Sequence, residues 1–352
     1  MRILYITRAK LSLSRAHTVN IIKTAEYLNM QNESSVVVFS SAADPQTARA
    51  VFVAKGVKNF FSLNISSCSR SLLLMLWQER KKFDVLYFRD PKLWLHAFFV
   101  RIIFGKKIVF EVHGSHEWRF AWLWWELSIA SADGIVFITE GLKKYYQPKK
   151  QNIVVHTNGV EMSAFEKPVD IRLLRRELNL PVDKKIIMYA GSFLWHSSSL
   201  VVEVSRRLPE GAVMVVVGLV DRDRKNKFFK DIISITRVEP KDIPRYLLAA
   251  DILINPLTIQ YPGSISSKLY EYLAAGKPII SSSGGANQEL LHDEENGLLV
   301  QTSDATSFIE AIGRLLKDPG LCERLAYAAQ QSAQRYSWDV RAAHITGLIK
   351  KL

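Results

Sequence analysis

The sequence predicts an α/β protein made of two doubly wound parallel-sheet domains, and three observations support this class. The chain has 352 residues, enough for two domains that each bury a core. Short β-branched runs alternate with longer helical stretches, which is typical of βαβ units. The runs are almost continuously apolar, as expected for strands that helices cover on both faces.

The first domain is predicted over residues 1–163. A helix is expected over residues 15–30, where the apolar spacing is helical. The strands of this domain are expected at 2–7, 34–40, 84–88, 107–113 and 134–139. The alternation pauses over 157–183, which contains an Asn-Gly pair and two prolines, so we place the linker there.

The second domain is predicted over residues 164–335. Its strands are expected at 185–191, 213–218, 232–235, 251–256, 277–283 and 297–300. Helices are expected over 305–317 and 320–335, and the final segment, 336–352, is expected to form a helix that crosses back to the first domain. We expect the two domains to face each other across a cleft, with ligands at the carboxyl ends of the strands.

Charge is distributed unevenly along the chain. The net charge is +13, and residues 1–165 hold 22 Lys and Arg against 12 Asp and Glu, while the remainder holds 25 against 22. Such an excess attracts nucleic acid, acidic lipid headgroups or phosphorylated substrates, and charge alone does not choose among them.

Cysteine usage and the N-terminus indicate a cytoplasmic protein. Cys68 and Cys322 lie in opposite halves and make neither a disulfide framework nor a metal site. The first residues lack the features of a secretory signal. The longest apolar stretch, 93–104, is too short to span a bilayer, although it could contact one from one side.

Several enzyme classes lack their motifs. The segment after the first strand, TRAKLSLSRAH, contains no glycine, which argues against a dinucleotide-binding dehydrogenase. There is no P-loop, no paired-histidine metal motif and no G-x-S-x-G serine.

The segment YPGSISSKLYEYLAAGKPIISSS predicts a phosphate site. A Gly/Ser loop leads into a helix expected to begin near Ser266, whose free N–H groups and dipole would attract an anion. Lys268 adds a positive charge, and Glu271 lies on the same helical face, where it can accept hydrogen bonds from sugar hydroxyls. The alternative is a capped surface helix with a local Lys–Glu pair.

This segment and its neighbours resemble the family-4 glycosyltransferases of the GT-B fold, in which two Rossmann-like domains face each other and use nucleotide sugars. The donor segment continues into SSGGANQELLHDEENGLLV, and SRAHTVNIIKTAEYL, DVLYFRDP, FEVHG, ITEGLKKYY and TNGVEMSAF resemble the family's acceptor-domain landmarks. The resemblance implies retaining transfer from a nucleoside diphosphate sugar to a saccharide or lipid-linked saccharide in bacterial surface polysaccharide or lipopolysaccharide biosynthesis. It implies no metal and no other cofactor.

The resemblance also assigns donor residues. Glu271 matches the second glutamate of the family's E-x7-E pair, which holds the ribose, whereas Gly263 stands where the first glutamate is usual. Ser192 and His196 are the nearest matches to the cationic clamp after KIIMYAG, whose usual lysine is absent. The predicted donor site comprises Gly191, Ser192, His196, Val238, Ser266, Ser267, Lys268, Leu269 and Glu271.

In the first domain, His113 resembles the histidine presented to the transferred sugar, and we expect it to be catalytic together with Lys268. Arg15, His17 and Glu140 are expected to line the acceptor side of the cleft. Each has a purely structural alternative: a satisfied turn histidine for His113, helix capping for Arg15 and His17, and a helix-dipole partner for Glu140.

The aromatic-rich helical stretches 94–104 and 118–125 give the basic first domain a means of resting on an anionic inner leaflet, unless these aromatics are core. Three other functions remain open: a nucleotide-sugar epimerase on the same architecture, a nucleic-acid-binding protein, and an inactive relative that only binds a partner. We expect no nucleic-acid partner, because no recognition motif is present.

Overall fold

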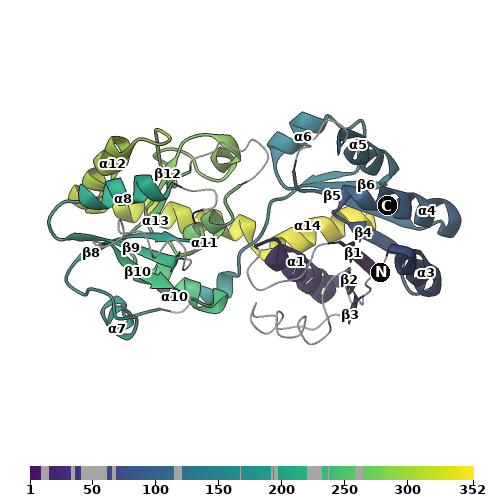
Figure 1. Cartoon of the computed structure of the whole chain (residues 1–352), viewed down its shortest axis with the longest axis horizontal. Helices are drawn as coiled ribbons and strands as arrows, with labels where there is room; N and C mark the ends of the chain where they lie inside the picture. The colour runs from purple at the N-terminus through teal and green to yellow at the C-terminus, as the bar shows by residue number, and fades with distance from the viewer. Residues whose placement is uncertain are drawn as a thin grey trace. The chain divides into compact units, whose positions relative to one another are not determined.

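The computed structural model describes residues 1–8, 16–32, 36–40, 62–65, 69–114, 121–166, 168–191, 193, 197–219, 232–236, 238–257 and 265–352. The chain divides into two compact units, shown in Figure 1. The first unit is Met1–Gly159 together with Trp338–Leu352, and the second is Val160–Ser337. The sequence predicts the two domain boundaries after residue 163 and after residue 335.

The first unit contains a seven-stranded parallel sheet in the order β3-β2-β1-β4-β5-β6-β7. Its strands are β1 (Ile3–Thr7), β2 (Val36–Ser40), β3 (Ser62–Ile65), β4 (Val85–Phe88), β5 (Lys107–Val112), β6 (Gly134–Phe137) and β7 (Ile153–Val155). Successive residues of β1 point to opposite faces and are buried on both, so that Ile3 and Tyr5 join one core cluster and Leu4 and Ile6 the other.

Helices cover both faces of this sheet. They are α1 (Ala16–Asn32), α3 (Ser69–Glu79), α4 (Trp94–Phe104), α5 (Ala121–Ser131), α6 (Glu140–Tyr146) and α14 (Trp338–Lys350). Side chains of α1 and α14 pack into one core, and those of α3 to α6 pack into the other. Helix α14 lies alongside α1, as Figure 1 shows, so the last helix of the chain belongs to the first unit.

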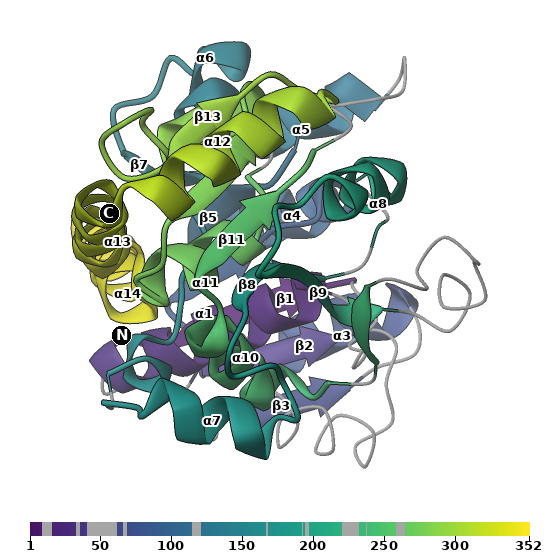
Figure 2. The same cartoon turned by 90° about the vertical axis from the view of Figure 1, so that its left-hand side faces the viewer.

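The second unit contains a six-stranded parallel sheet in the order β10-β9-β8-β11-β12-β13. Its strands are β8 (Lys185–Ala190), β9 (Ala212–Leu219), β10 (Ile233–Thr236), β11 (Ile252–Asn255), β12 (Ile279–Ser282) and β13 (Leu298–Val300). Its helices are α7 (Ile171–Glu177), α8 (Ser198–Arg206), α10 (Ile243–Ala249), α11 (Lys268–Ala274), α12 (Ala305–Lys317) and α13 (Pro319–Ala333). Figure 2 shows α8 and α12 over one face of this sheet, and α10 and α11 pack into the core cluster on the other.

The predicted fold class is confirmed, with local differences. The sequence did not reveal β3 and β7, because β3 (SLNI) is half polar and β7 has only three residues next to the predicted linker. Helix α11 begins at Lys268, whereas the sequence predicted a start near Ser266. Among the described residues, no helix combines the length and apolarity needed to cross a bilayer.

Gly159 packs closely against Trp338, the first residue of α14, and this predicts an effect of substitution. A Cβ atom at Gly159 would lie 2.6 Å from Cδ2 and 3.0 Å from Cα of the buried Trp338. We expect Gly159→Ala to lower the free energy of unfolding by ~1–3 kcal/mol through overpacking. Urea unfolding followed by tryptophan fluorescence measures this loss.

Gly313 supplies the matched control for this prediction. It lies inside α12, and a Cβ there meets no atom within 4 Å. Gly313→Ala should therefore be neutral or raise the free energy of unfolding by up to ~1 kcal/mol. Equal stability of the two variants would contradict tight packing of Trp338 on Gly159.

Candidate functional site

The second unit has a topological switch point between two of its strands. Strand β8 pairs with β9 on one side and with β11 on the other, so the chain leaves β8 and returns to it from opposite directions. Open parallel sheets bind ligands in the crevice outside the carboxyl ends of such strands. In this unit those ends are Ala190, which is followed by Gly191, and Asn255.

Lys268, the first residue of α11, reaches the end of β8. Its Nζ donates to the hydroxyl of Tyr189 at 2.8 Å and lies 4.0 Å from the centroid of the same ring. A Cβ atom at Gly191 would lie 2.7 Å from this Nζ and 3.0 Å from Cε, so a side chain there would displace the end of the lysine from this position. Gly191 also has φ +131, a conformation that favours glycine. Lys268 and Gly191, both predicted donor residues, are therefore in contact.

The environment of Lys268 disfavours its positive charge. Burial lowers the pKa of the Lys268 ammonium well below its usual range, and the negative charge of Glu271 opposes that shift. The ring of Tyr189 is itself stacked on Phe193, with centroids 4.7 Å apart. This stacking keeps the Tyr189 ring in place beside the ammonium of Lys268. An anion bound beside Lys268 would stabilise the charged form and restore its pKa.

Internal hydrogen bonds hold the residues before α11. The Ser266 N–H donates to Oδ1 of Asn287 at 3.0 Å, and the Ser266 hydroxyl donates to Oδ1 of Asn255 at 3.3 Å. Asn255 in turn donates to the Ser281 hydroxyl at 2.9 Å, which joins the ends of β11 and β12. The Ser266 N–H, expected from the sequence to be free for phosphate, is thus occupied. Ser267, the exposed N-cap of α11, makes no side-chain capping bond.

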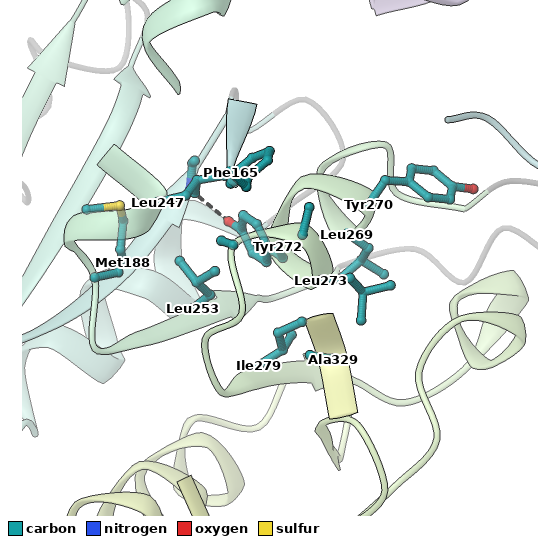
Figure 3. Packing of buried hydrophobic residues seen from close by; sticks show 14 of the residues in the cluster. Phe165, Met188, Leu247, Leu253, Leu269, Tyr270, Tyr272, Leu273, Ile279 and Ala329 are labelled. Carbon is teal, nitrogen blue, oxygen red and sulfur yellow. Dashed lines mark hydrogen bonds between the residues drawn. The ribbon is translucent and has the colours of Figure 1, made fainter. Parts of the chain in front are cut away.

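The buried face of α11 anchors it to β8. Tyr272 is buried and its hydroxyl accepts the Ala190 N–H at 2.9 Å, as the dashed line in Figure 3 shows. Leu269 was predicted to bind the donor, but its side chain is fully buried in the core and its N–H donates to the Ser266 carbonyl at 3.0 Å. Tyr272 and Leu269 therefore position α11, whereas Lys268 and Glu271 lie on its half-buried side.

The other predicted donor residues are placed as follows. Val238 follows β10 and lines a hollow of about 360 Å³ together with Lys241, Arg245 and Tyr246. Ser192, His196 and Gly263 lie outside the described residues. Asn287, which the sequence did not single out, is buried, and its Nδ2 has no hydrogen-bond partner among the described residues.

In the first unit, His113 follows β5 and belongs to a buried polar cluster. Its Nε2 contacts Oε1 of Glu111, which also forms an ion pair with Arg341 and accepts a hydrogen bond from the Tyr87 hydroxyl. Glu111 and Arg341 are both almost completely buried. Burial opposes the charge of Glu111, but Arg341 holds the pKa of this carboxyl well below its usual range.

Arg341 connects α14 to the ends of β5 and β7. Its guanidinium donates to the carbonyls of His156 and Thr157 at 2.6 and 2.8 Å and to the Thr24 hydroxyl at 3.4 Å, in addition to pairing with Glu111. These partners come from three segments of the unit: α1, β5 and the residues that follow β7. The forked guanidinium can satisfy them together, which a lysine cannot do.

His113 is held as a neutral imidazole. Burial and the nearby positive charge of Arg89 lower its pKa to about 4, although Glu111 raises it. A neutral ring that carries its proton on Nε2, beside Oε1 of Glu111, keeps Nδ1 as an acceptor. The arrangement suits a histidine that orients a hydroxyl group and not one that serves as a general acid.

Of the residues expected on the acceptor side, Glu140 is exposed at the start of α6, with Oε2 3.4 Å from Nζ of Lys143. That position fits its structural alternative, a negative charge at a helix N-terminus. His17 lies within α1, but its side chain, like all of Arg15, falls outside what the structure describes. In the described part of the chain, no three His, Cys, Asp or Glu residues gather as metal ligands would.

Sequence reasoning missed Glu111 and Arg341. The available signal was a single acidic residue inside the apolar strand KIVFEV, which requires a buried partner. Its partner is 230 residues away along the chain, and no sequence periodicity connects the two.

The ion pair predicts a large loss of stability when one partner is removed. Arg341→Met leaves the Glu111 carboxylate buried without its main cation, and we expect the free energy of unfolding to fall by ~3–5 kcal/mol. The double variant Glu111→Gln with Arg341→Met should recover part of this loss, because no buried charge remains. Denaturant unfolding of the single and double variants measures both the loss of stability and its partial recovery. A loss below about 1 kcal/mol, the range of exposed pairs, would contradict the assignment.

The depressed pKa of His113 predicts how stability depends on pH. The unfolded state protonates this histidine near pH 6.5, whereas the folded state does so near pH 4. Since the unfolded state then binds more protons, stability falls as the pH drops between these values. We expect His113→Gln to make that decline shallower, as measured by urea unfolding at several pH values. A His113 ring signal that titrates near pH 6.5 in nuclear magnetic resonance would refute the prediction.

Comparisons with known proteins agree with this fold. The family described as Glycosyl transferases group 1 matches residues 170–332, and Glycosyltransferase Family 4 matches residues 20–164. The D-inositol 3-phosphate glycosyltransferase of Xylanimonas cellulosilytica is 28% identical over 241 residues, covering 62% of this chain and 57% of that protein. The chain therefore spans little more than half the length of this curated relative.

Solved structures match over the whole chain. The crystal structure of Anabaena Alr3699/HepE in complex with UDP has a TM-score of 0.81 at 14% identity and covers 100% of both chains. The apo lipopolysaccharide outer core galactosyltransferase WaaB has a TM-score of 0.71 at 17% identity, again over 100% of both. Glycosyltransferase Family 4 thus matches the first half of the chain and Glycosyl transferases group 1 matches the second, and the solved glycosyltransferases share its two-domain fold, which is the GT-B fold.

Proposed function

We propose that the chain is a retaining glycosyltransferase that moves a sugar from a nucleoside diphosphate to a saccharide or lipid-linked saccharide in bacterial surface polysaccharide biosynthesis. One observation carries the proposal: a half-buried lysine, Lys268, lies against Gly191 at the switch point of the second unit. A desolvated cation at the carboxyl edge of a parallel sheet is suited to a phosphate ligand.

The donor is proposed to bind to the second unit. Uridine diphosphate sugars are the first candidates, because the Anabaena protein of similar fold was solved with UDP and with UDP-glucose. Lys268 would contact the diphosphate, and Glu271, three residues later on α11, would accept hydrogen bonds from the ribose. With glycine at position 263, the sugar ring must be held by another group, and the unpartnered Nδ2 of Asn287 is a donor that could serve.

Stabilising the leaving group is the main chemical requirement. Negative charge grows on the diphosphate as the bond from the anomeric carbon to its oxygen breaks. Lys268 is held in place before the reaction by the Tyr189 hydroxyl and ring, so it can stabilise this charge without reorganising. We propose that the reaction needs no metal ion.

Retention is proposed to follow from attack on the same face that the diphosphate leaves. The acceptor oxygen forms a bond to the anomeric carbon while the bond to the diphosphate breaks, and the acceptor proton passes to a diphosphate oxygen. His113 would orient a hydroxyl of the transferred sugar through Nδ1, since its lowered pKa keeps the ring neutral.

Two variants on α11 test the donor site. Lys268→Ala should lower turnover by about a hundredfold or more, as expected when one preorganised donor to a developing charge is lost. Glu271→Ala should mainly raise the donor KM, by about tenfold, because its hydrogen bonds are made in the ground state as well. Product formation from a panel of nucleotide sugars, with saccharide and lipid-linked acceptors, measures both parameters.

Lys317→Ala is the matched control, because Lys317 is exposed at the end of α12. This variant should leave both the turnover and the donor KM unchanged. Unchanged kinetics in the two α11 variants would refute the site. Turnover of a donor without any acceptor would favour an epimerase, and a donor that raises the melting temperature without forming product would favour an inactive relative.

We also propose a cytoplasmic location with peripheral contact to the inner face of the plasma membrane. The excess of Lys and Arg in residues 1–165 supports attraction to anionic lipids. Such contact would bring a lipid-linked acceptor to the first unit.

A further inference from the structure

Exposed apolar side chains concentrate on three helices of the first unit. Of the sixteen large hydrophobic residues that are exposed in the described part of the chain, ten lie on α3, α4 and α5. Single exposed hydrophobic residues are ordinary, but a cluster of this size on one set of helices marks an interaction surface. We call it the aromatic face and define it by Leu74, Trp77, Leu95, Ile102, Trp122 and Trp124, which are 39% to 62% exposed.

The three helices form one continuous surface. All three pack their buried sides into the same core cluster, so their outer sides point away from the same face of the sheet. Helix α4 contacts α5, and Trp77 of α3 meets Phe104 of α4 edge to face, with ring centroids 5.7 Å apart. Figure 1 shows α3, α4 and α5 as neighbours in this unit.

Positive charge exceeds negative charge along the segment that carries the aromatic face. Residues 69–133, which include α3, α4 and α5, contain ten Lys and Arg against seven Asp and Glu. Several of these acids are paired with cations: Glu79 with Lys82, Asp84 with Arg2, Asp90 with Arg8, Asp133 with Arg101 and the buried Glu111 with Arg341.

The cations also approach the tryptophans of this surface directly. The Arg80 guanidinium lies 4.7 Å from the Trp77 ring centroid, and the Lys92 ammonium lies 5.4 Å from that of Trp124. Helix α4 contains no acidic residue, and α5 contains only Glu126. Apolar and cationic groups are thus interleaved on one surface.

We propose that the aromatic face docks onto the surface of a bilayer that contains anionic lipids. Tryptophan suits the boundary between headgroups and acyl chains, because its ring is apolar and its N–H is polar. Lys and Arg at the rim match anionic headgroups, and apolar burial adds to that attraction. The inference specifies the surface for the membrane contact proposed above and rests on that proposal, but not on the transfer reaction.

A second copy of the chain fits this surface less well than a bilayer. Two copies meeting through the aromatic face would bring the same excess of positive charge together, which disfavours the contact. Insertion across the membrane is also excluded for these helices, since each has 11 residues and a span needs about 20. The three helices would therefore lie parallel to the bilayer surface.

Vesicle binding by the full chain, without donor or acceptor, tests the inference. We expect cosedimentation with vesicles of phosphatidylcholine and phosphatidylglycerol in equal parts, weak binding to phosphatidylcholine alone, and weaker binding at high salt. Tryptophan emission should shift to the blue on binding. Failure to bind anionic vesicles at low salt would overturn the proposal and leave the transferase assignment untouched.

Variants then assign the binding to this surface. The triple variant Leu74→Ser, Leu95→Ser and Ile102→Ser should weaken binding at least tenfold while keeping the melting temperature and any transfer to a water-soluble acceptor. Leu173→Ser with Tyr327→Ser, which changes two exposed residues of the second unit, should bind as the unmodified chain does. Equal binding by the triple variant would overturn the assignment. The assignment would also be overturned if the unmodified chain formed dimers without lipid in analytical ultracentrifugation and the triple variant did not.

Discussion

The buried ion pair between Arg341 and Glu111 is the interaction on which the first unit depends most. Glu111 interrupts an otherwise apolar strand, and a carboxylate at that depth is tolerated only beside a compensating cation. The cation comes from α14, at the far end of the chain, so the last helix must fold with the first unit. The same carboxylate contacts His113 and keeps the ring oriented at the end of β5. The Glu111 carboxylate therefore contributes both to the stability of the first unit and to the orientation of His113.

Among the described residues, the half-buried cation of the second unit, Lys268, has no such carboxylate partner. Lys268 rests on the ring and hydroxyl of Tyr189, and in the described structure no carboxylate lies within ion-pair distance of its ammonium. Desolvation consequently lowers its pKa, whereas Glu111 in the first unit is stabilised as an anion. A charge whose compensation is incomplete is suited to binding a ligand of opposite sign. This difference between Lys268, which has no carboxylate partner in the described part of the chain, and Arg341, which has Glu111, is the physical basis for proposing that the donor diphosphate binds at Lys268.

Much of the candidate site could be predicted from local sequence, and the remainder could not. Lys268 and Glu271 were recognisable because a loop followed by a helix start is a local pattern. Gly191 was recognisable as the end of a strand. The occupied N–H of Ser266 and the buried position of Leu269 were not, because both depend on how α11 packs against neighbouring strands.

The sequence by itself determined the fold class, since continuous apolar runs and helical periodicity are properties of short segments. It also identified the unusual density of aromatic residues around α4 and α5, but not whether they are core. Only the tertiary structure decided that, because it shows which side of each helix the sheet covers and which side it leaves exposed. It alone also joined Arg341 to Glu111, since contacts between residues far apart in the chain arise from packing and leave no local pattern.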